Sequence, residues 1–265
     1  VLDRVDLILH IFDKHAVTKE AKLQIELARM RYMGPRIYGM GFVMSRQGGG
    51  IGTSGVGETN TELMKRHWRN EIKKVNDQLD KLTAEREKRI ERRKKEGFKT
   101  VSIVGYTNAG KSNLFNKLTG RNVLVENALF ATLDSVVGEV YVPELSQKVL
   151  FTDTIGFIRN LPPRLIQAFK STLLESIHAD VILHLIDASD HESFEKIKVV
   201  EEILNDLRID SSRVIYVFNK IDKISEAEVS KLEEDFREYS PIFISVKNGL
   251  GLEKLTREIV LRLNT

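Results

Sequence analysis

The chain of 265 residues contains no cysteine. Disulfide bonds, thiolate catalysis and zinc sites with cysteine ligands are therefore excluded. No stretch approaches the roughly 18 uncharged apolar residues that a membrane-spanning helix requires, so we expect no membrane span. The first residues also lack the basic-then-apolar plan of a secretory signal peptide. These absences lead us to expect a cytoplasmic protein.

The charge is unevenly distributed along the chain. Residues 1–96 contain 21 Lys and Arg against 14 Asp and Glu, a net charge of +7. Residues 97–265 contain 20 against 24, a net charge of −4. A basic part joined to a mildly acidic part indicates that the basic part meets a polyanion.

A helical region is expected before Gly97, which we take as a domain boundary between residues 1–96 and 97–265. Residues 59–96 lack proline and glycine and predict a long basic helix. An earlier helix is expected from Thr18 to Tyr32, ended by Gly34-Pro35, and could pair antiparallel with it. Apolar residues at helical spacing form the expected seam between the two helices: Leu23, Leu27 and Met30 on one, and Trp68, Ile72, Val75, Leu79 and Leu82 on the other.

Beyond Leu82 the seam positions of the long helix are occupied by Arg86 and Arg89, so we expect this helix to be solvated there.

A glycine-rich loop, residues 47–58, lies between these two helices. Six of the ten residues from 48 to 57 are glycine, and glycine loses the most backbone entropy on ordering. One interpretation is a flexible linker. The other is a loop that closes on a phosphate backbone, which the embedded Ile51 and Val56 favour because flexible linkers are usually Gly/Ser mixtures.

After Gly97, strand-like and helix-like segments alternate, which predicts an α/β fold with a mainly parallel sheet covered by helices. Ligands of such sheets bind beyond the carboxyl ends of the strands. The expected strands are 100–104, 148–152, 181–186, 214–218 and 242–244. The expected helices are 111–119, 168–177, 193–207, 226–238 and 252–263.

The first strand is followed by a phosphate-binding motif, G-x-x-x-x-G-K-[ST], that opens a helix. Its glycines let backbone N–H groups surround phosphates. We expect Lys111 to reach the β and γ phosphates and Ser112 to bind Mg²⁺. The motif comprises Gly105, Tyr106, Thr107, Asn108, Ala109, Gly110, Lys111 and Ser112, and Asn113 follows it in the expected nucleotide site.

Three further motifs follow later strands in order. Asp153-Thr154-Ile155-Gly156 can hold the metal through water and contact a γ-phosphate. In Asn219-Lys220-Ile221-Asp222, the carboxylate of Asp222 would accept hydrogen bonds from guanine, whose donor pair adenine lacks. Ser245-Val246-Lys247 would close over the base. Four motifs at four strand ends predict a GTP-binding domain.

Between the first two motifs, residues 129–134 contain the candidate switch threonine, Thr132, with Phe130 and Ala131 before it. Its hydroxyl would bind Mg²⁺ and its N–H would sense the γ-phosphate. Thr107, Thr119 and Thr152 compete on proximity, and a spacing of about 20 residues after the phosphate-binding loop favours Thr132.

With these motifs the chain resembles the HflX family of translation-factor-related GTPases. The matching segments are 45–52, 55–59, 129–134, 153–159 and 161–162, and the opening residues 1–4 resemble an interior segment of that family's N-terminal domain. The resemblance implies that an α/β segment ahead of residue 1 is missing here. It also implies a ribosome-associated GTPase that binds the large subunit through rRNA and separates stalled or idle ribosomes. Val246 stands where the family more usually has alanine, and the larger valine side chain would crowd the base.

The expected mechanism relies on Lys111, Thr132 and Gly156, with Ser112, Thr132 and Asp153 around Mg²⁺. Phe157 follows the second motif where many GTPases have glutamine, and phenylalanine cannot orient a water, so intrinsic turnover should be slow. Packing of Phe157 in this segment is the competing interpretation. Asn108 either recruits a potassium ion, as its arrangement does in other GTPases, or only shapes the loop.

Two functions of different classes follow from the sequence. The first is a GTPase that acts on ribosomes as a monomer. The second is a nucleotide-gated scaffold on RNA or a membrane surface in which hydrolysis is incidental. The run of six basic residues in 88–95 is either a solvated helix end or a contact with rRNA phosphates.

Overall fold

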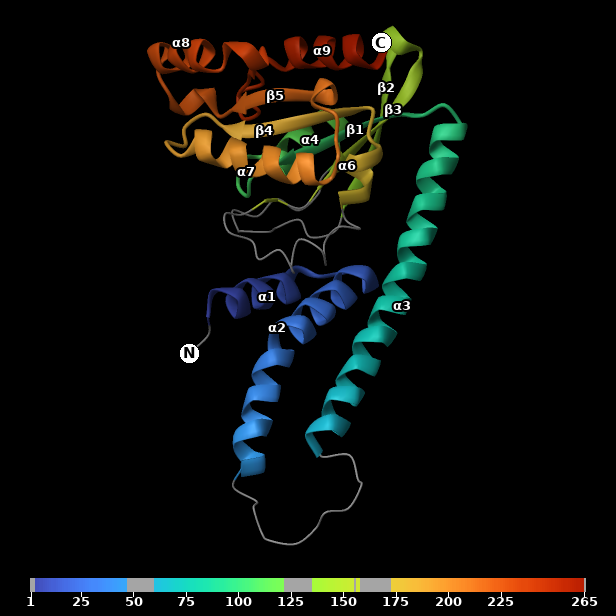
Figure 1. Ribbon diagram of the computed structural model, residues 1–265. Coiled ribbons are helices and arrows are strands. Elements are labelled where there is room, and N and C mark those ends of the chain that lie inside the picture. The colour runs from blue at the N-terminus through green and yellow to red at the C-terminus, as the bar shows by residue number, and fades with distance from the viewer. Residues whose placement is uncertain (1–2, 47–59, 122–134, 155, 158–172, 265) are drawn as a thin grey trace, which may run out of the picture. The chain divides into compact units, whose positions relative to one another are not determined.

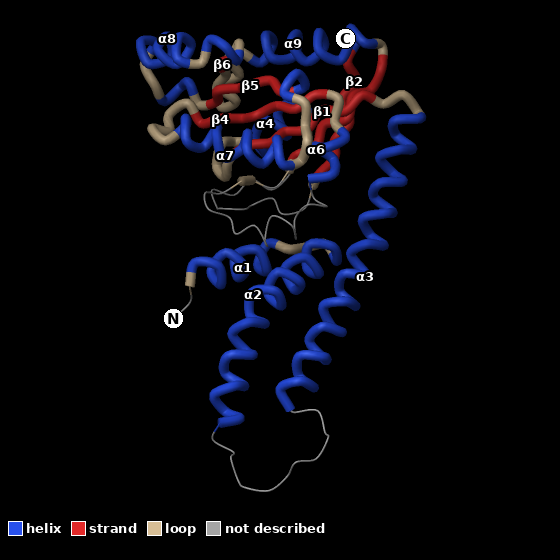
Figure 2. The backbone as a smooth tube through the Cα atoms, in the orientation of Figure 1, coloured by secondary structure: helices blue, strands red, loops and turns tan. Residues whose placement is uncertain are grey.

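The computed structural model describes residues 3–46, 60–121, 135–154, 156–157 and 173–264 (Figures 1 and 2). These residues divide into two compact units, one up to Arg86 and the other from Glu87 onward. Among them, no helix combines the length and the apolar character needed to cross a membrane. The glycine-rich loop lies outside the described residues.

The first unit contains helices α1 (Arg4–His15), α2 (Lys19–Arg46) and most of α3 (Asn60–Lys95). Helix α1 was not predicted from the sequence. Its N-cap is Asp3, whose Oδ1 accepts a hydrogen bond from the Asp6 N–H at 2.9 Å, as short polar side chains do at helix starts. Ile8, Leu9 and Phe12 are buried at helical spacing. They supply the apolar stripe that stabilises so short a helix.

Helices α2 and α3 pair antiparallel, as predicted. Leu23 and Leu27 of α2 form one buried cluster with Val75 and Leu79 of α3, and Met30, Ile72 and Leu82 pack against it. Hydrogen bonds and an ion pair fix the direction. Arg86 contacts Glu20 near the start of α2, and Trp68 contacts Met30 further along it.

The prediction that Gly34-Pro35 ends α2 was wrong, because the helix continues to Arg46. A proline inside a helix removes one backbone hydrogen bond and costs about 3 kcal/mol. Trp68 of α3 contacts the helix just before this proline. The Trp68 indole N–H donates to the Met30 carbonyl at 3.2 Å, and a Cβ on Gly34 would lie 2.8 Å from Trp68 Nε1.

The expected solvation of α3 beyond Leu82 was also wrong at two positions. Arg86 Nη2 lies 2.9 Å from Glu20 Oε2, and both side chains are almost buried, at 12% and 10% exposed. Ile90 is buried in the second unit. A seam position occupied by arginine can therefore still contact its neighbour when that neighbour offers a carboxylate.

The second unit is built on a six-stranded sheet in the order β2-β3-β1-β4-β5-β6. All neighbouring strands are parallel except β2 and β3, so the predicted fold class is confirmed. The strands are β1 (Lys99–Gly105), β2 (Val136–Val142), β3 (Gln147–Asp153), β4 (Val181–Asp187), β5 (Val214–Asn219) and β6 (Ile242–Phe243).

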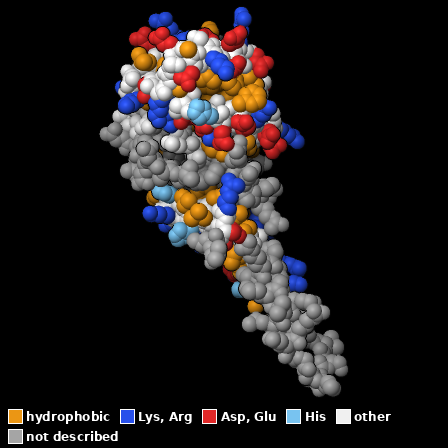
Figure 3. All heavy atoms as spheres, turned by 90° about the vertical axis from the view of Figure 1, so that its left-hand side faces the viewer, with side chains coloured by type: hydrophobic (Ala, Val, Ile, Leu, Met, Phe, Trp, Pro, Cys, Tyr) orange, Lys and Arg blue, Asp and Glu red, His pale blue; other side chains and the backbone are white. Residues whose placement is uncertain are grey.

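Helices cover both faces of this sheet, with α7 on one side and α9 on the other in Figure 1. Leu255, Ile259 and Leu263 of α9 and Leu114 and Phe115 of α4 belong to one buried cluster with alternate strand residues. The helices are α4 (Lys111–Thr119), α6 (Leu174–His178), α7 (Ser193–Asp206), α8 (Glu226–Asp235) and α9 (Leu252–Asn264). The predicted helix 168–177 is described only from Leu174. On the face in Figure 3, acidic and basic side chains of this unit are mixed.

Candidate nucleotide-binding site

The phosphate-binding loop connects β1 to α4. Gly110 is the N-cap of α4 and has φ of 100°, which an L side chain rarely adopts. A Cβ at this position would also lie 2.5 Å from Asn219 Nδ2. The glycine that the motif requires is therefore fixed by both backbone conformation and packing. The N-terminus of α4 is left bare of side-chain caps, as an anion-binding helix end needs.

Lys111 begins α4 and is buried, with 7% of its surface exposed. Its Nζ donates to the Tyr106 carbonyl at 3.0 Å. Burial lowers the pKa of Lys111 to about 8, and the nearby negative charge of Asp153 opposes this shift. A cation at a buried helix start that forms no ion pair with any described residue is suited to bind an incoming anion.

Ser112 and Asp153 lie next to each other, although they come from α4 and from the end of β3. The Ser112 hydroxyl donates to Asp153 Oδ2 at 2.6 Å, and Asp153 is fully buried. A hydroxyl and a carboxylate in contact are hard oxygen donors, which Mg²⁺ prefers in combination with phosphate oxygens and water. The two residues therefore fit a magnesium ion.

The segment after β3 is attached to the phosphate-binding loop by its backbone. The Thr107 N–H donates to the Phe157 carbonyl at 2.8 Å, and the Phe157 N–H donates to the Gly105 carbonyl at 3.0 Å. Phe157 is buried at 4% exposed, so in this structure its side chain packs, as the competing interpretation held. At Gly156 a Cβ would lie 2.9 Å from Lys111 Nζ. The same Cβ would lie 3.0 Å from the Thr107 Cα, so a side chain here would crowd the phosphate-binding loop.

Asn219 ends β5 and joins two loops. Its buried side chain donates from Nδ2 to the Ala109 carbonyl at 2.9 Å, and its Oδ1 accepts from the Val246 N–H at 3.1 Å. Lys220 has φ of 67° and donates from Nζ to the Asn108 carbonyl and to Asp187 Oδ2, both at 2.7 Å. Asn219 and Lys220, the first two residues of this motif, thus hold the phosphate-binding loop in place.

Asp222 and Ser245 meet at the opposite side of the cavity. The Ser245 hydroxyl donates to Asp222 Oδ1 at 2.5 Å, and this hydrogen bond lowers the pKa of Asp222. The carboxylate is therefore ionised at neutral pH and is held as an acceptor. Val246 and Lys247 line the same cavity.

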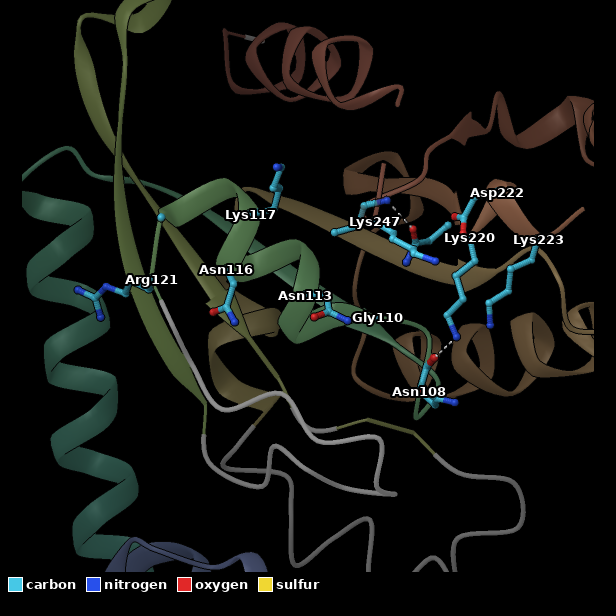
Figure 4. A pocket seen from close by; sticks show the side chains of 13 residues that line it. Asn108, Gly110, Asn113, Asn116, Lys117, Arg121, Lys220, Asp222, Lys223 and Lys247 are labelled. Atoms are coloured by element: carbon cyan, nitrogen blue, oxygen red, sulfur yellow. Dashed lines mark hydrogen bonds between the residues drawn. The ribbon is translucent and has the colours of Figure 1, made fainter. Parts of the chain in front are cut away.

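A cavity of about 620 Å³ lies among these loops (Figure 4), within the range of small-molecule sites. In Figure 4 Lys220 extends toward Asn108 while Asp222 lies at the far side. The sequence analysis did not predict five lining residues: Asn116, Lys117, Gly120, Arg121 and Lys223. Asn116 and Lys117 follow Asn113 by three and four positions, so helical periodicity could have found them.

Several expected site residues lie outside the described residues: Phe130, Ala131, Thr132 and Ile155. Two competing threonines have other contacts. The Thr119 hydroxyl donates to the Phe115 carbonyl at 2.7 Å, and Thr152 is buried within β3. Thr107 lies in the phosphate-binding loop and lines a neighbouring cavity.

Comparison with known proteins gives a consistent result. Residues 15–93 match the family described as GTP-binding GTPase Middle Region, and residues 100–220 match the 50S ribosome-binding GTPase family. A GTP-binding protein of Sulfolobus solfataricus, solved in complex with GDP, is 30% identical, with a TM-score of 0.58 over all of this chain and 73% of that one.

Two curated relatives are named GTPase HflX. The protein of Caldanaerobacter subterraneus is 48% identical over 98% of this chain and 59% of its own length. That of Lacrimispora saccharolytica is 43% identical over 99% and 62%. The chain thus spans about three-fifths of the length of these relatives. It contains a GTPase domain and belongs to the HflX family of GTPases.

Proposed function

We propose that the protein binds GTP with Mg²⁺, hydrolyses it to GDP and phosphate, and associates with the large ribosomal subunit to split or rescue ribosomes. The observation that carries the first part is the cavity lined jointly by the phosphate-binding loop, by Asp222 and by Val246 and Lys247. These residues come from three loops at the carboxyl ends of the parallel strands β1, β5 and β6, which is where such sheets bind ligands.

Base selection falls to Asp222 in this proposal. Its carboxylate is held ionised by Ser245, and it can accept hydrogen bonds from the ring N–H and the exocyclic amine of guanine. Adenine has no such donor pair. The Val246 N–H already donates to Asn219, so we assign it to shaping the base pocket.

Phosphate binding falls to Lys111 and to the backbone N–H groups of residues 105–113. Ser112 and Asp153 would hold Mg²⁺, the latter through water, together with Thr132. When bound, the metal neutralises charge that develops on the phosphates. The Gly156 backbone lies next to the Lys111 ammonium, where its N–H could donate to the γ-phosphate.

Among the described residues we identify no group that would orient the attacking water for GTP hydrolysis. Phe157 is packed and its backbone is bonded to the phosphate-binding loop, and its side chain has no polar atom. We therefore propose slow intrinsic turnover that a partner accelerates. A potassium ion bound by Asn108 would add positive charge near the phosphates.

The ribosomal part of the proposal is supported by two observations. The matched family is described as 50S ribosome-binding, and residues 1–96 carry a net charge of +7. Lys and Arg side chains that neutralise RNA phosphates release counterions, which drives association at moderate salt. We propose that a monomer binds rRNA of the large subunit through this basic region and the loop 47–58.

Base choice is tested by Asp222→Asn, which replaces an acceptor by a donor. GTP affinity should fall by about 100-fold or more, or roughly 2.8 kcal/mol, while xanthosine triphosphate should bind. Glu233→Gln on α8 is the matched control, because it removes one exposed carboxylate outside the cavity. Unchanged GTP affinity in Asp222→Asn would refute the assignment.

Ribosome action is tested by measuring GTP turnover with and without purified large subunits. We expect strong stimulation of the parent chain, and loss of that stimulation with intact intrinsic turnover after deletion of residues 48–57. A parent chain that subunits fail to stimulate would favour the scaffold function instead. A deletion variant stimulated as strongly as the parent would show that the loop is only a linker.

A further inference from the structure

A second cavity lies at the other end of the same sheet. Its volume is about 440 Å³, and it is lined at the amino ends of β1, β4 and β5. Lys99 opens β1 there, whereas the phosphate-binding loop follows Gly105 at the carboxyl end of that strand. The lining residues are Lys94, Lys99, His178, Ala179, Asp180, Val181, Ser212, Arg213 and Arg262.

Positive charge dominates this cavity. Four lysine and arginine side chains line it against one carboxylate, that of Asp180. That carboxylate is already engaged, because its Oδ2 accepts from the Thr100 N–H at 2.7 Å and from the Thr100 hydroxyl at 2.9 Å. Within the described part of the chain, neither Lys94 nor Lys99 forms an ion pair. No described carboxylate therefore neutralises these two ammonium groups.

The two arginines are fixed in place by backbone carbonyls. Arg213 Nη1 donates to the carbonyls of Ile177 at 3.2 Å and Ala179 at 2.8 Å. Arg262 Nη1 donates to the Ser212 carbonyl at 2.6 Å, and its Nε pairs with Glu258. Such bonds orient the guanidinium planes before any ligand arrives, which reduces the entropy lost on binding.

A histidine lies beside these cations. His178 has a lowered pKa, first because of burial and next because of the charge of Lys94, while the carboxylates of Glu87 and Glu175 oppose the shift. The lowered pKa favours the neutral imidazole, which can donate one hydrogen bond. Fixed guanidinium groups, two ammonium groups and an imidazole form a donor set that suits phosphate oxygens.

We propose that this cavity binds a backbone phosphate of an RNA strand. An RNA strand fits better than a single small anion because the cations continue outside the cavity. The last turn of α3 carries Arg92, Arg93, Lys94 and Lys95. Arg92 and Arg93 pair with Glu96 and Glu175, whereas Lys94 lines the cavity and Lys95 follows it without an ion pair to any described residue. The choice of RNA as the partner rests on the proposed function, whereas the cavity and its charges do not. The inference adds a contact that lies on the GTPase domain itself, at the end of the sheet away from the nucleotide.

The test compares two variants with the same change in net charge. Lys94→Glu/Lys99→Glu reverses the two cavity lysines. Lys231→Glu/Lys254→Glu reverses two exposed lysines on α8 and α9 that do not line the cavity. Binding of the full chain to a fluorescent single-stranded RNA of mixed sequence is measured by anisotropy over a series of KCl concentrations. GDP affinity of both variants serves as the folding control.

We expect the cavity variant to bind RNA at least tenfold more weakly than the control variant. The slope of log affinity against log salt should become shallower by about 1.4, as expected for two lost contacts to single-stranded phosphates. Equal RNA affinity and equal slopes in the two variants would overturn the proposal. A second result would also overturn it: inorganic phosphate stabilises the parent but not the cavity variant, while the two variants bind RNA equally. The cavity would then hold a free anion.

A parallel experiment with large ribosomal subunits separates this inference from the proposed function. If the parent chain binds the RNA through the cavity but does not bind the subunits, the ribosomal proposal fails and the cavity remains an RNA site. If the subunits stimulate turnover of both variants equally and neither loses RNA affinity, the ribosomal proposal stands and the cavity inference fails.

Discussion

The two units each bury a charged side chain, and they treat it differently. In the helical unit Arg86 contacts Glu20 at 2.9 Å, so the buried cation meets its counter-charge within the fold. In the sheet unit the ammonium group of Lys111 donates to a backbone carbonyl, while the Asp153 carboxylate nearby accepts from Ser112. Burial lowers the pKa of Lys111 to about 8. The first charge therefore serves the packing of two helices, whereas the second is placed to bind an anionic ligand.

Replacing Lys111 should have the largest effect, which is on GTP affinity. Lys111→Met keeps the length of the side chain but removes the charge, so GTP affinity should fall by about 1,000-fold, or roughly 4 kcal/mol. Titration with a fluorescent GTP analogue measures it. Arg86→Met, the same change at the other buried cation, should leave that affinity within about threefold. Equal losses in both variants would remove the distinction between the two sites.

The burial of Lys111 should also make the stability of the chain depend on pH. The pKa of Lys111 is about 8 in the folded chain against 10.5 ordinarily, so between these values the unfolded state binds more protons. The free energy of unfolding should therefore rise with pH across this window, by about 3 kcal/mol for this group. Urea unfolding at pH 7 and at pH 10 measures the change. Lys111→Met should lose this rise, and an equal rise in both proteins would contradict the origin assigned to it.

Breaking the helical ion pair from one side should have a smaller effect. Arg86→Met leaves the nearly buried Glu20 carboxylate without this partner and should destabilise the helical unit by about 2 kcal/mol. Removing both charges in Glu20→Leu/Arg86→Met should restore most of that stability. Thermal unfolding followed by circular dichroism gives both values. A double variant as unstable as the single one would mean that the pair contributes more than charge compensation.

The smallest expected effect concerns a cation from solution. If Asn108 recruits potassium, replacing K⁺ by Na⁺ should slow GTP hydrolysis by about tenfold, or ~1.4 kcal/mol of barrier. Asn108→Ala should make the rate insensitive to the salt used, and phosphate release is the measurement. Identical parent rates in the two salts would leave Asn108 with its structural role, in which its carbonyl accepts from Lys220.

The elements of the fold that have a strong local sequence pattern could be predicted from the sequence. The parallel strands are nearly continuous apolar runs, and each functional motif follows one of them. Strand β2 was missed because its residues, Val136–Val142, belong to an antiparallel edge strand, in which only part of the pattern is buried. Helix α1 was missed because Asp3, the cap that begins the helix, stands at the third residue of the chain.

The contacts that tie the site together could not be derived from sequence. Ser245 and Asp222 are 23 positions apart, and Asn219 joins Ala109 to Val246 across more than 100 positions. The motifs indicate which residues face the nucleotide. They do not indicate which residues hold one another, because those pairings depend on the order of strands in the sheet.

One further consequence concerns Trp68, the single tryptophan of the chain. Its half-buried indole donates to the Met30 carbonyl within the helical unit. Excitation at the red edge of the indole band would therefore report on this unit alone, since the GTPase domain contributes no tryptophan emission. The chain thus contains an optical probe with which movement of α2 against α3 can be followed in real time.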